Sequence, residues 1–220
     1  MSKNSVVITS AIRTAVGSLN KSLKNVPSHH LGSAVISGSI NKSKLNNDEI
    51  DEIIIGQVLT SGIGQNPARQ ASIHSGIPKE KPAYIVNQVC GSGIRSVASG
   101  FQSIRAGDSK IIIAGGQENM SLAPHAIHLR EGKKLGDAEI VDTMIKDGLW
   151  DAFNGYHMGV TAENVAEKFQ ITRDQQDKFA LRSQQKALDA QKQNKFSNEI
   201  INYKIKSKKA EIDFNKDEHP

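Results

Sequence analysis

The only cysteine of this 220-residue chain, Cys90, stands within the segment Val-Asn-Gln-Val-Cys-Gly-Ser-Gly-Ile-Arg-Ser-Val at residues 86–97. An apolar run ends there and a pattern of helical spacing starts directly after it, which predicts a strand-to-helix junction. α/β proteins place their ligand sites at the carboxyl ends of such strands. The free N–H groups of the following helix favour a thiolate, and Gly91 and Gly93 leave room for a substrate beside the sulfur. These features indicate a nucleophile.

A lone cysteine has a second interpretation, because free cysteine is among the most buried residue types and usually packs as a small hydrophobe. The predicted position at the sheet edge counts against that role. A fast thiol nucleophile also needs an adjacent base, most often histidine. The seven histidines form no motif that identifies this base, so the residues alone leave the activator open.

The elements that would position Cys90 alternate between strand-like and helix-like segments. We expect strands at residues 6–8, 53–59, 83–87 and 110–115, and helices at residues 30–40, 67–75 and 94–106. The second helix has clear boundaries, with Asn66 as N-cap, Pro67 at the first helical position and Gly76 past the end. Such alternation predicts a mainly parallel sheet covered by helices, an α/β unit that ends near residue 118.

The second half differs in character. Residues 119–158 lack sustained periodicity, and an irregular segment of that length is functional or disordered in most proteins. Two helices and two weak strands are expected after it, at residues 162–169, 172–193, 199–206 and 210–214. A capping box formed by Thr172 and Gln175 marks the start of the longer helix.

Composition excludes several classes of protein. One cysteine permits neither an internal disulfide nor a Cys-x-x-Cys metal site. The net charge of +5 is spread along the chain without interleaved aromatic residues, which favours a basic solvated surface over nucleic-acid binding. No apolar run reaches membrane-spanning length, and the first residues have neither signal-peptide nor transit-peptide character. We therefore expect a cytoplasmic protein that binds neither nucleic acid nor membranes.

The segment "NQVCGSGIRSVASG" is similar to the one that bears the acylated cysteine of thiolases, the acyl-CoA acetyltransferases. Four further segments resemble thiolase segments in the same order: "SAIRTAVGS" at 10–18, "GQNPARQASIHSGIP" at 64–78, "AGGQENMSLAPH" at 114–125, and the stretch at 156–187 that begins "YHMGVTAENV". The resemblance runs from near residue 6 to Pro220, and on these motifs the chain is identified as a member of the thiolase family.

The resemblance implies an α/β, thiolase-like fold limited to its N-terminal half. Residues 1–118 would form the core domain, with a mainly parallel mixed sheet covered by helices. Residues 119–220 would form an inserted, incomplete α+β loop domain that covers the active site and holds much of the coenzyme A (CoA). The other half of a thiolase supplies the activating histidine of a Gly-His-Pro motif, a proton-shuttling second cysteine and an asparagine-bound water. We therefore expect a fragment or truncated product that lacks the C-terminal half and has negligible turnover alone.

Cys90 matches the family's nucleophile. The implied reaction condenses two acetyl-CoA molecules to acetoacetyl-CoA, or runs the reverse thiolysis, through an acyl thioester on Cys90 whose backbone N–H helps to stabilise the oxyanion. Leu149, His157 and Met158 match the stretch that lines the pantetheine and acyl pocket, although a core-packing role explains Met158 equally well. CoA thioesters enter as substrates, and we expect no cofactor and no metal.

The paired His157 and Met158 before Gly159 resemble the short-chain, acetoacetyl-CoA type rather than the long-chain type. Residues 130–148 resemble the loop through which many short-chain thiolases form tetramers, so the full-length form is expected to be a homo-oligomer, a dimer or a tetramer. Three alternatives stay open: a non-catalytic product that binds CoA or assembles with full-length subunits, a broader-range 3-ketoacyl-CoA thiolase, and a ketoacyl synthase. The match of the loop domain counts against the last.

Other residues receive structural interpretations. Arg69 and Gln70 would lie near the family's dimer interface and serve the fold. The glycines of "GGQENMS" lack the spacing and the following lysine of a phosphate-binding loop, and would allow close backbone approach beneath the active site. We expect His29 and His30 to lie on a solvated surface rather than to bind a metal.

Overall fold

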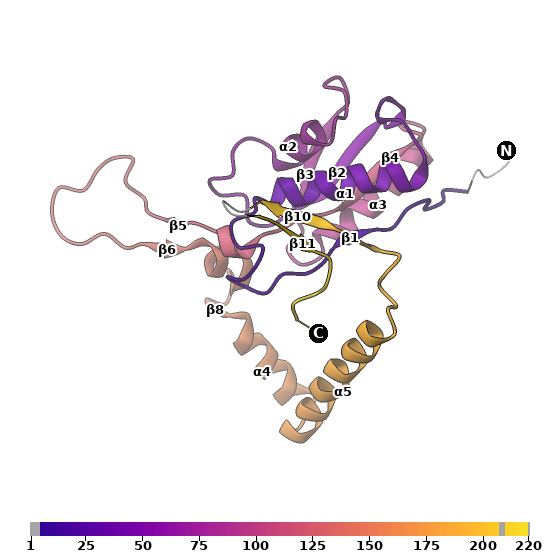
Figure 1. Cartoon of the computed structure of the whole chain (residues 1–220). Helices are drawn as coiled ribbons and strands as arrows, with labels where there is room; N and C mark the ends of the chain where they lie inside the picture. The colour runs from indigo at the N-terminus through magenta and orange to yellow at the C-terminus, as the bar shows by residue number, and fades with distance from the viewer. Residues whose placement is uncertain (1–4, 207–209, 220) are drawn as a thin grey trace. The chain divides into compact units, whose positions relative to one another are not determined.

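The computed structural model describes residues 5–206 and 210–219. Contacts divide the chain into two compact units, the first formed by residues 1–123 and 199–218 and the second by residues 124–198 and 219–220. Figure 1 follows the chain by colour through both units. The sequence therefore leaves the first unit after Ala123 and returns to it at Glu199.

A three-stranded parallel sheet forms the centre of the first unit. Its order is β3 (Ala83–Val86), β2 (Glu52–Gly56), β4 (Ile112–Gly116), with Ile54 opposite Tyr84 on one side and Ala114 on the other. The strands agree with the segments predicted from the apolar runs, except that β2 begins one residue earlier and β4 extends one residue further. The predicted parallel sheet is confirmed.

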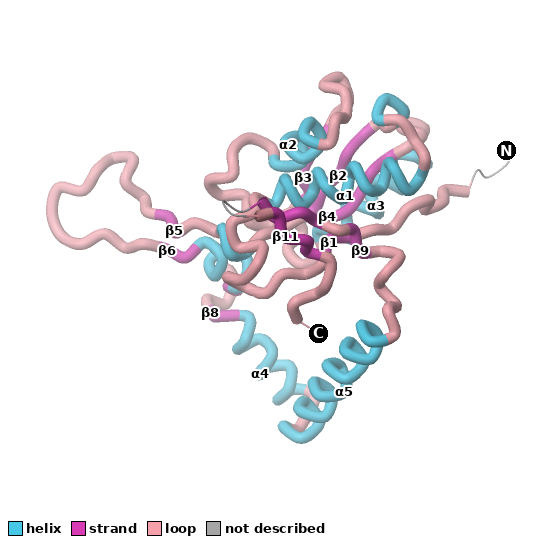
Figure 2. Tube along the Cα trace, viewed as in Figure 1, coloured by secondary structure: helices cyan, strands magenta, loops and turns pink. Residues whose placement is uncertain are grey.

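Helices cover both faces of this sheet. They are α1 (Ser28–Ser43), α2 (Pro67–His74) and α3 (Ser92–Ala106), and Figure 2 shows them around the strands. Side chains of a strand alternate between faces. Ile53 and Ile55 pack into a cluster with residues of α1 and α2, whereas Gly56, on the opposite face, lies against the first turn of α3. Thus α1 and α2 share one face and α3 covers the other.

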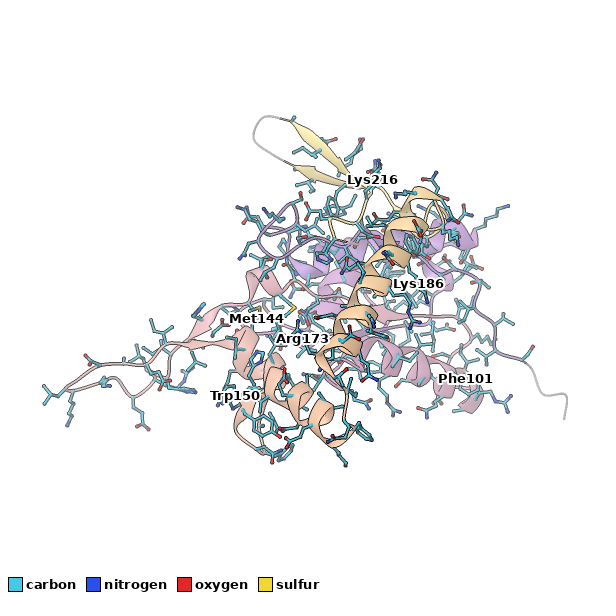
Figure 3. The ribbon with its side chains drawn as sticks, turned by 90° about the horizontal axis from the view of Figure 1, so that it is seen from below. Phe101, Met144, Trp150, Arg173, Lys186 and Lys216 are labelled. Atoms are coloured by element: carbon cyan, nitrogen blue, oxygen red, sulfur yellow. The ribbon has the colours of Figure 1, made fainter. Side chains whose placement is uncertain are left out.

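The helix boundaries follow the signals in the sequence. Asn66 caps α2, its side chain accepting a hydrogen bond from the Arg69 N–H, and Pro67 is the first helical residue. Gly107 ends α3 in the left-handed conformation, with φ of 92°. The outer surface of α3 exposes Ile94, Val97 and Phe101, and Phe101 is labelled in Figure 3. Spacings of three and four residues place these apolar side chains on one stripe of the helix.

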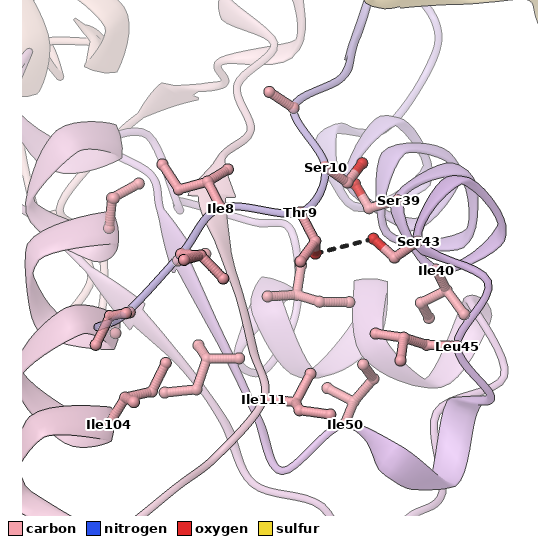
Figure 4. A pocket seen from close by; sticks show the side chains of 18 of the residues that line it. Ile8, Thr9, Ser10, Ser39, Ile40, Ser43, Leu45, Ile50, Ile104 and Ile111 are labelled. Atoms are coloured by element: carbon pink, nitrogen blue, oxygen red, sulfur yellow. Dashed lines mark hydrogen bonds between the residues drawn. The ribbon is translucent and has the colours of Figure 1, made fainter. Parts of the chain in front are cut away.

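The strand expected at residues 6–8 is absent, since residues 5–12 form neither helix nor strand. A cavity of about 490 Å³ lies between residues 6–12, the end of α1, α3 and β4. Figure 4 shows this cavity and the hydrogen bond of 3.2 Å that joins the Thr9 and Ser43 hydroxyl groups across its rim. Because the cavity lies between residues 6–12 and the edge strand β4, the backbone of residues 6–12 forms no ladder with β4.

The returning segment packs on residues 13–31. Parallel pairing joins β1 (Arg13–Thr14) to β9 (Ile200–Ile201), and β10 (Tyr203–Lys206) pairs antiparallel with β11 (Glu211–Phe214). These strands confirm the two weak strands expected near the end of the chain. Phe214 is buried in a second cluster, whose other buried members are Ala15, Leu23, Val26 and Leu31.

Arg13 holds the returning segment by charge. Its Nε donates to Glu199 at 2.7 Å, and its two Nη atoms donate to the carboxylate of Asp217 at 2.7 and 3.0 Å. The backbone N–H of Val16 also donates to Asp217, at 2.7 Å. These hydrogen bonds, those from Arg13 foremost, hold the pKa of the Asp217 carboxyl below its usual value.

The second unit consists of short strands followed by two helices. The pairs β5 (His125–Ala126) with β6 (Val141–Asp142) and β7 (Trp150–Asp151) with β8 (Tyr156–His157) are antiparallel. A π-helical turn, η3 (Met144–Leu149), lies between β6 and β7, and single 3₁₀ turns occur in the first unit at η1 (Asn47–Glu49) and η2 (Met120–Leu122). The expected irregular excursion thus contains short paired segments that its sequence did not predict.

The helices of the second unit are α4 (Met158–Lys168) and α5 (Arg173–Lys192), which runs between the labelled Arg173 and Lys186 in Figure 3. The capping box of Thr172 and Gln175 is confirmed, with each side chain accepting from the other's backbone N–H. Helix α4 begins four residues before the expected start at Ala162, because the His157 side chain caps it by accepting from the Gly159 N–H at 2.9 Å.

The two compact units differ from the predicted core domain at 1–118 and loop domain at 119–220. Residues 199–218 pack with the first unit through Arg13 and Phe214. Contact density does not test the family's own domain division, which stays a prediction. None of the helices in the described part of the chain combines the length and apolarity of a membrane span.

Replacing Asp217 with Asn tests the role of the Arg13 contact. At neutral pH we expect Asp217→Asn to lower the free energy of unfolding by about 2–3 kcal/mol, the scale of hydrogen bonds to charged groups. A depressed carboxyl pKa contributes stability above the unfolded value near 3.9, and this contribution is lost as pH falls through the folded value. Urea unfolding at several pH values should therefore show the difference from wild type vanish in acid.

Asp108→Asn is the matched control, because Asp108 is an exposed carboxyl of the same unit. Its effect should stay within about 0.5 kcal/mol. An Asp217→Asn loss that is unchanged between pH 7 and pH 3 would contradict the ionic contribution.

Candidate active site

Cys90 lies where the sequence places it, between the end of β3 at Val86 and the start of α3 at Ser92. It is a free and exposed cysteine, so the alternative of a buried packing residue is wrong. Parallel strands end together at one edge of a sheet. The thiol therefore stands at the edge formed by the carboxyl ends of β2, β3 and β4.

A tight turn carries the thiol from strand to helix. The Ser92 hydroxyl accepts from the Gln88 N–H at 2.9 Å and donates to the Val89 carbonyl at 2.6 Å. The Asn87 side chain accepts from the Val89 N–H at 3.0 Å, and the Gly91 N–H donates to the Gln88 carbonyl at 3.0 Å. The residues on both sides of Cys90 are thus held by four short hydrogen bonds.

The residue directly before the nucleophile candidate has a strained backbone. Val89 has φ of 48°, in the left-handed region that β-branched residues rarely adopt. Such strain, of order 1–3 kcal/mol, persists only where the surroundings impose it. Here the hydrogen bonds through Asn87 and Ser92 impose it, and the turn leaves Cys90 exposed.

The start of α3 lies directly on the end of β2, which requires a residue without a side chain at position 56. A Cβ at Gly56 would lie 2.4 Å from the Ser92 carbonyl carbon, and one at Gly116 would lie 3.5 Å from the Gly93 Cα. The fully buried Ser96 joins helix to sheet by donating toward the carbonyls of Gly93 and Gly115, at 2.6 and 2.7 Å. In "GGQENMS" a Cβ at Gly115 would meet no atom within 4 Å and one at Gly116 would make only ordinary contacts, so the close backbone approach expected of these glycines is found at Gly56 instead.

Buried amides and a carboxyl fill the same edge of the sheet. Gln57 donates to the Ser28 hydroxyl at 3.0 Å and accepts from Gln117 at 2.8 Å. The Glu118 carboxylate accepts from the N–H groups of Val58 and Leu59, at 2.9 and 3.2 Å. Burial raises the pKa of Glu118, and these backbone donors oppose that rise. The network crosslinks the residues that follow β2 and β4.

The predicted CoA-contact residues lie at one end of a hairpin in the second unit. Trp150 of β7 pairs with His157 of β8, so Leu149 and Met158 are the neighbouring residues at that end. Met158 is 37% exposed and His157 is exposed, whereas Leu149 is half-buried. Because the His157 Nδ1 accepts the cap of α4, its Nε2 is the atom left to contact a ligand.

Cys90 belongs to the first compact unit, and Leu149, His157 and Met158 belong to the second. The structure thus brings the three CoA-contact candidates together, and their relation to the thiol stays a prediction. Sequence reasoning missed Val89, whose strain has no signature in residue type. It also missed Gly56, although a glycine at the end of an Ile-Ile-Ile strand signals close approach.

The structure also tests the expected roles of two pairs of residues, Arg69 with Gln70 and His29 with His30. Arg69 donates to the Lys79 and Lys81 carbonyls, and Gln70 donates to those of Ile63 and Gln65, which agrees with structural roles. The expectation of a solvated surface at residues 29–30 is wrong for His29, which is only 9% exposed. It lies in the contact between α1 and α2, a packing that two adjacent histidines do not reveal.

Comparison with known proteins gives the family. Residues 6–220 match the family model "Thiolase, N-terminal domain". The chain belongs to the thiolase family. The predicted resemblance is therefore confirmed over nearly the whole chain.

Relatives and a solved structure agree with this membership. An acetyl-CoA acetyltransferase of Rhizobium meliloti is 54% identical over 219 residues, covering 100% of this chain and 56% of the relative. The cytosolic acetyl-CoA acetyltransferase of Rattus norvegicus is 50% identical, covering 98% and 54%. The crystal structure of the Bacillus anthracis acetyl-CoA acetyltransferase superposes with a TM-score of 0.94 at 36% identity, covering 97% and 54%. The thiolase-like fold is thus confirmed, and the chain spans about half the length of the curated relatives it matches.

Adding one methyl group at Gly56 tests the contact beneath the thiol. In Gly56→Ala the new Cβ would overlap the Ser92 backbone, so we expect a loss of at least 1–3 kcal/mol in the free energy of unfolding, typical of overpacking. Thermal and urea unfolding measure this loss directly.

Gly115→Ala is the matched control, since a Cβ at Gly115 of β4 meets no atom within 4 Å. We expect it to change stability by less than about 0.5 kcal/mol. Equal effects of the two substitutions would show that the glycine at 56 serves backbone flexibility rather than contact.

Proposed function

We propose that the chain takes part in acyl transfer between CoA thioesters, with Cys90 as the acylated nucleophile. The reaction is the condensation of two acetyl-CoA molecules to acetoacetyl-CoA and free CoA, or the reverse thiolysis. One observation carries the proposal: the chain's only thiol is exposed on a strained turn at the carboxyl edge of the sheet. Membership of the thiolase family and the names of its relatives support it.

The chemistry requires two transfers at the same sulfur. The Cys90 thiolate attacks the carbonyl carbon of acetyl-CoA, and the tetrahedral oxyanion collapses to acetyl-Cys90 with release of the CoA thiolate, which takes up a proton. A second acetyl-CoA loses a proton from its methyl carbon, and the resulting carbanion attacks the acetyl thioester. Acetoacetyl-CoA leaves and the Cys90 thiolate is regenerated.

The backbone of the turn offers a donor for the oxyanion. Within the described residues, the turn's hydrogen bonds engage the N–H groups of residues 88, 89, 91 and 92 and not that of Cys90. We assign the Cys90 N–H to the oxyanion of the thioester steps, where a preorganised donor stabilises charge that develops in the transition state.

The turn supplies no general base. The side chains of residues 87–89 and 91–93 are amides, an aliphatic group, a hydroxyl and glycines, none of which titrates near neutral pH. Deprotonation of the thiol therefore depends on a group outside this turn. We propose the histidine implied by the family resemblance for that step.

CoA itself would contact the second unit. Leu149 and Met158 offer apolar surface to the pantetheine chain or the acyl group, and the His157 Nε2 offers a polar contact beside them. The net charge of +5 favours a polyanionic ligand such as CoA. We propose CoA thioesters as substrates without another cofactor, a homo-oligomer as the full-length assembly, and the cytoplasm as the compartment, since one relative is named cytosolic.

Mass spectrometry after incubation with acetyl-CoA tests the nucleophile. We expect one acetyl group per chain on the peptide that contains Cys90, removable by neutral hydroxylamine because it is a thioester. Cys90→Ala should carry none. Any lysine acetylation would resist hydroxylamine and appear equally in both proteins, which makes it an internal control.

One result would reject acylation at Cys90, and another would change the substrate. Acetyl groups confined to lysines, with CoA still bound by the protein, would favour the non-catalytic binding product. A Cys90 thioester that forms faster from longer 3-ketoacyl-CoA substrates than from acetoacetyl-CoA would keep the nucleophile and favour the broader-range thiolase.

A further inference from the structure

Three imidazole rings meet between the start of α1 and the end of α2, on the face of the sheet opposite α3. Ring centroids of His29 and His30 are 4.7 Å apart, and the His74 centroid lies 5.4 Å from the first and 5.1 Å from the second. Within residues 5–206 and 210–219, this is the one group of three potential metal ligands with converging atoms. The acyl-transfer chemistry uses none of them.

The geometry suits a small divalent cation. Each histidine offers one ring nitrogen, and the three nitrogens lie within 4.8 Å of one another. Around tetrahedral Zn²⁺, bonds of 2.0–2.1 Å place imidazole nitrogens about 3.3 Å apart. His30 and His74 are exposed, so rotation of these two side chains can close the difference, while burial holds His29 in place.

A second observation also points to a ligand. The His29 Nδ1 is buried and has no hydrogen-bond partner, although buried polar atoms are almost always paired. His29 as a whole is only 9% exposed. The buried member of the cluster therefore has a ring nitrogen without a hydrogen-bond partner, which is the state expected of a histidine that binds a metal.

We propose that His29, His30 and His74 bind a first-row divalent cation such as Zn²⁺, with water completing the coordination. Three imidazoles with one open position form a recognised ligand set for zinc, and imidazole also suits copper and nickel. Bound there, the ion would tie α1 to α2. The ion would have a structural role and would take no part in the acyl transfer proposed above.

The electrostatics agree with this assignment. Burial lowers the pKa of His29, and His30 and His74 lower it further; burial and His74 lower the pKa of His30 as well. A lower pKa favours the neutral ring, the form of imidazole that binds a metal. The free N–H groups at the start of α1 disfavour a cation, and the negative end of the α2 dipole, where His74 lies, offsets them.

Zinc titration of the full chain against a chromophoric chelator tests the site. The Cys90→Ser background removes the thiol as a competing ligand. We expect one Zn²⁺ per chain, and we expect His30→Gln and His74→Gln each to weaken binding by more than 10-fold, since losing even an outer partner of a ligand costs 10–100-fold. Both substituted side chains are exposed, so the fold should persist, and far-UV circular dichroism checks it.

His128→Gln is the matched control, an exposed histidine of the second unit, and should leave zinc affinity unchanged. Zinc should also raise the thermal midpoint of the starting protein and not that of the His30→Gln, His74→Gln double variant. No stoichiometric zinc binding, or binding that survives in the double variant, would overturn the proposal. The rings would then be packing contacts between two helices.

Discussion

The contact of the first turn of α3 with the ends of β2 and β4 is the constraint on which the site depends. The main chain of Gly56 lies directly against that of Ser92 and Gly93, because Gly56 has no side chain to separate them. Ser96, buried on the next turn, then reaches the carbonyl of Gly115 on the sheet. A helix held at this distance leaves only a short path from β3, so residues 87–91 must turn sharply. The strained Val89 and the exposed Cys90 follow from that short path.

The edge beneath the thiol is polar, which is unusual for the centre of an α/β unit. Gln57, Gln117 and Glu118 stand where apolar residues would pack more simply, and their hydrogen bonds fix the loops after β2 and β4 in one arrangement. Buried polar groups of this kind carry a desolvation penalty unless paired. The amide oxygen of Gln117 and the second carboxylate oxygen of Glu118 have no partner in the described structure. The hydrogen-bond network therefore makes the carboxyl edge of the sheet rigid, and its unpaired buried oxygens lower the free energy of unfolding.

Local signals made much of the fold predictable from the sequence. The caps at Asn66 and Gly107 and the capping box at Thr172 are determined by neighbours in the chain, and the isoleucine run of β2 needs two covered faces. The features that could not be predicted depend on contacts between residues far apart in the sequence. Residues 6–8 have strand composition but pair with no strand in the described structure, and His29 is buried by a helix that begins 38 positions later, at Pro67.

The candidate site divides in the same way. The position of Cys90 followed from the junction of two periodicities, and the thiol's role followed from family resemblance. The strain at Val89 arises from hydrogen bonds that no spacing rule describes. The shared hairpin end of Leu149, His157 and Met158 is set by the pairing of Trp150 with His157, which the irregular sequence around it conceals.

The salt bridge between Arg13 and Asp217 has a consequence for the order of folding. These residues are 204 positions apart, so closing that loop carries an entropic term of about 5 kcal/mol by the logarithmic rule. During synthesis the sheet and its helices can form early from local segments, whereas β1 stays without its partner until the ribosome has passed Ile201. The cluster around Phe214 must therefore assemble after the sheet, and until then Ala15, Leu23 and Leu31 face water or a chaperone.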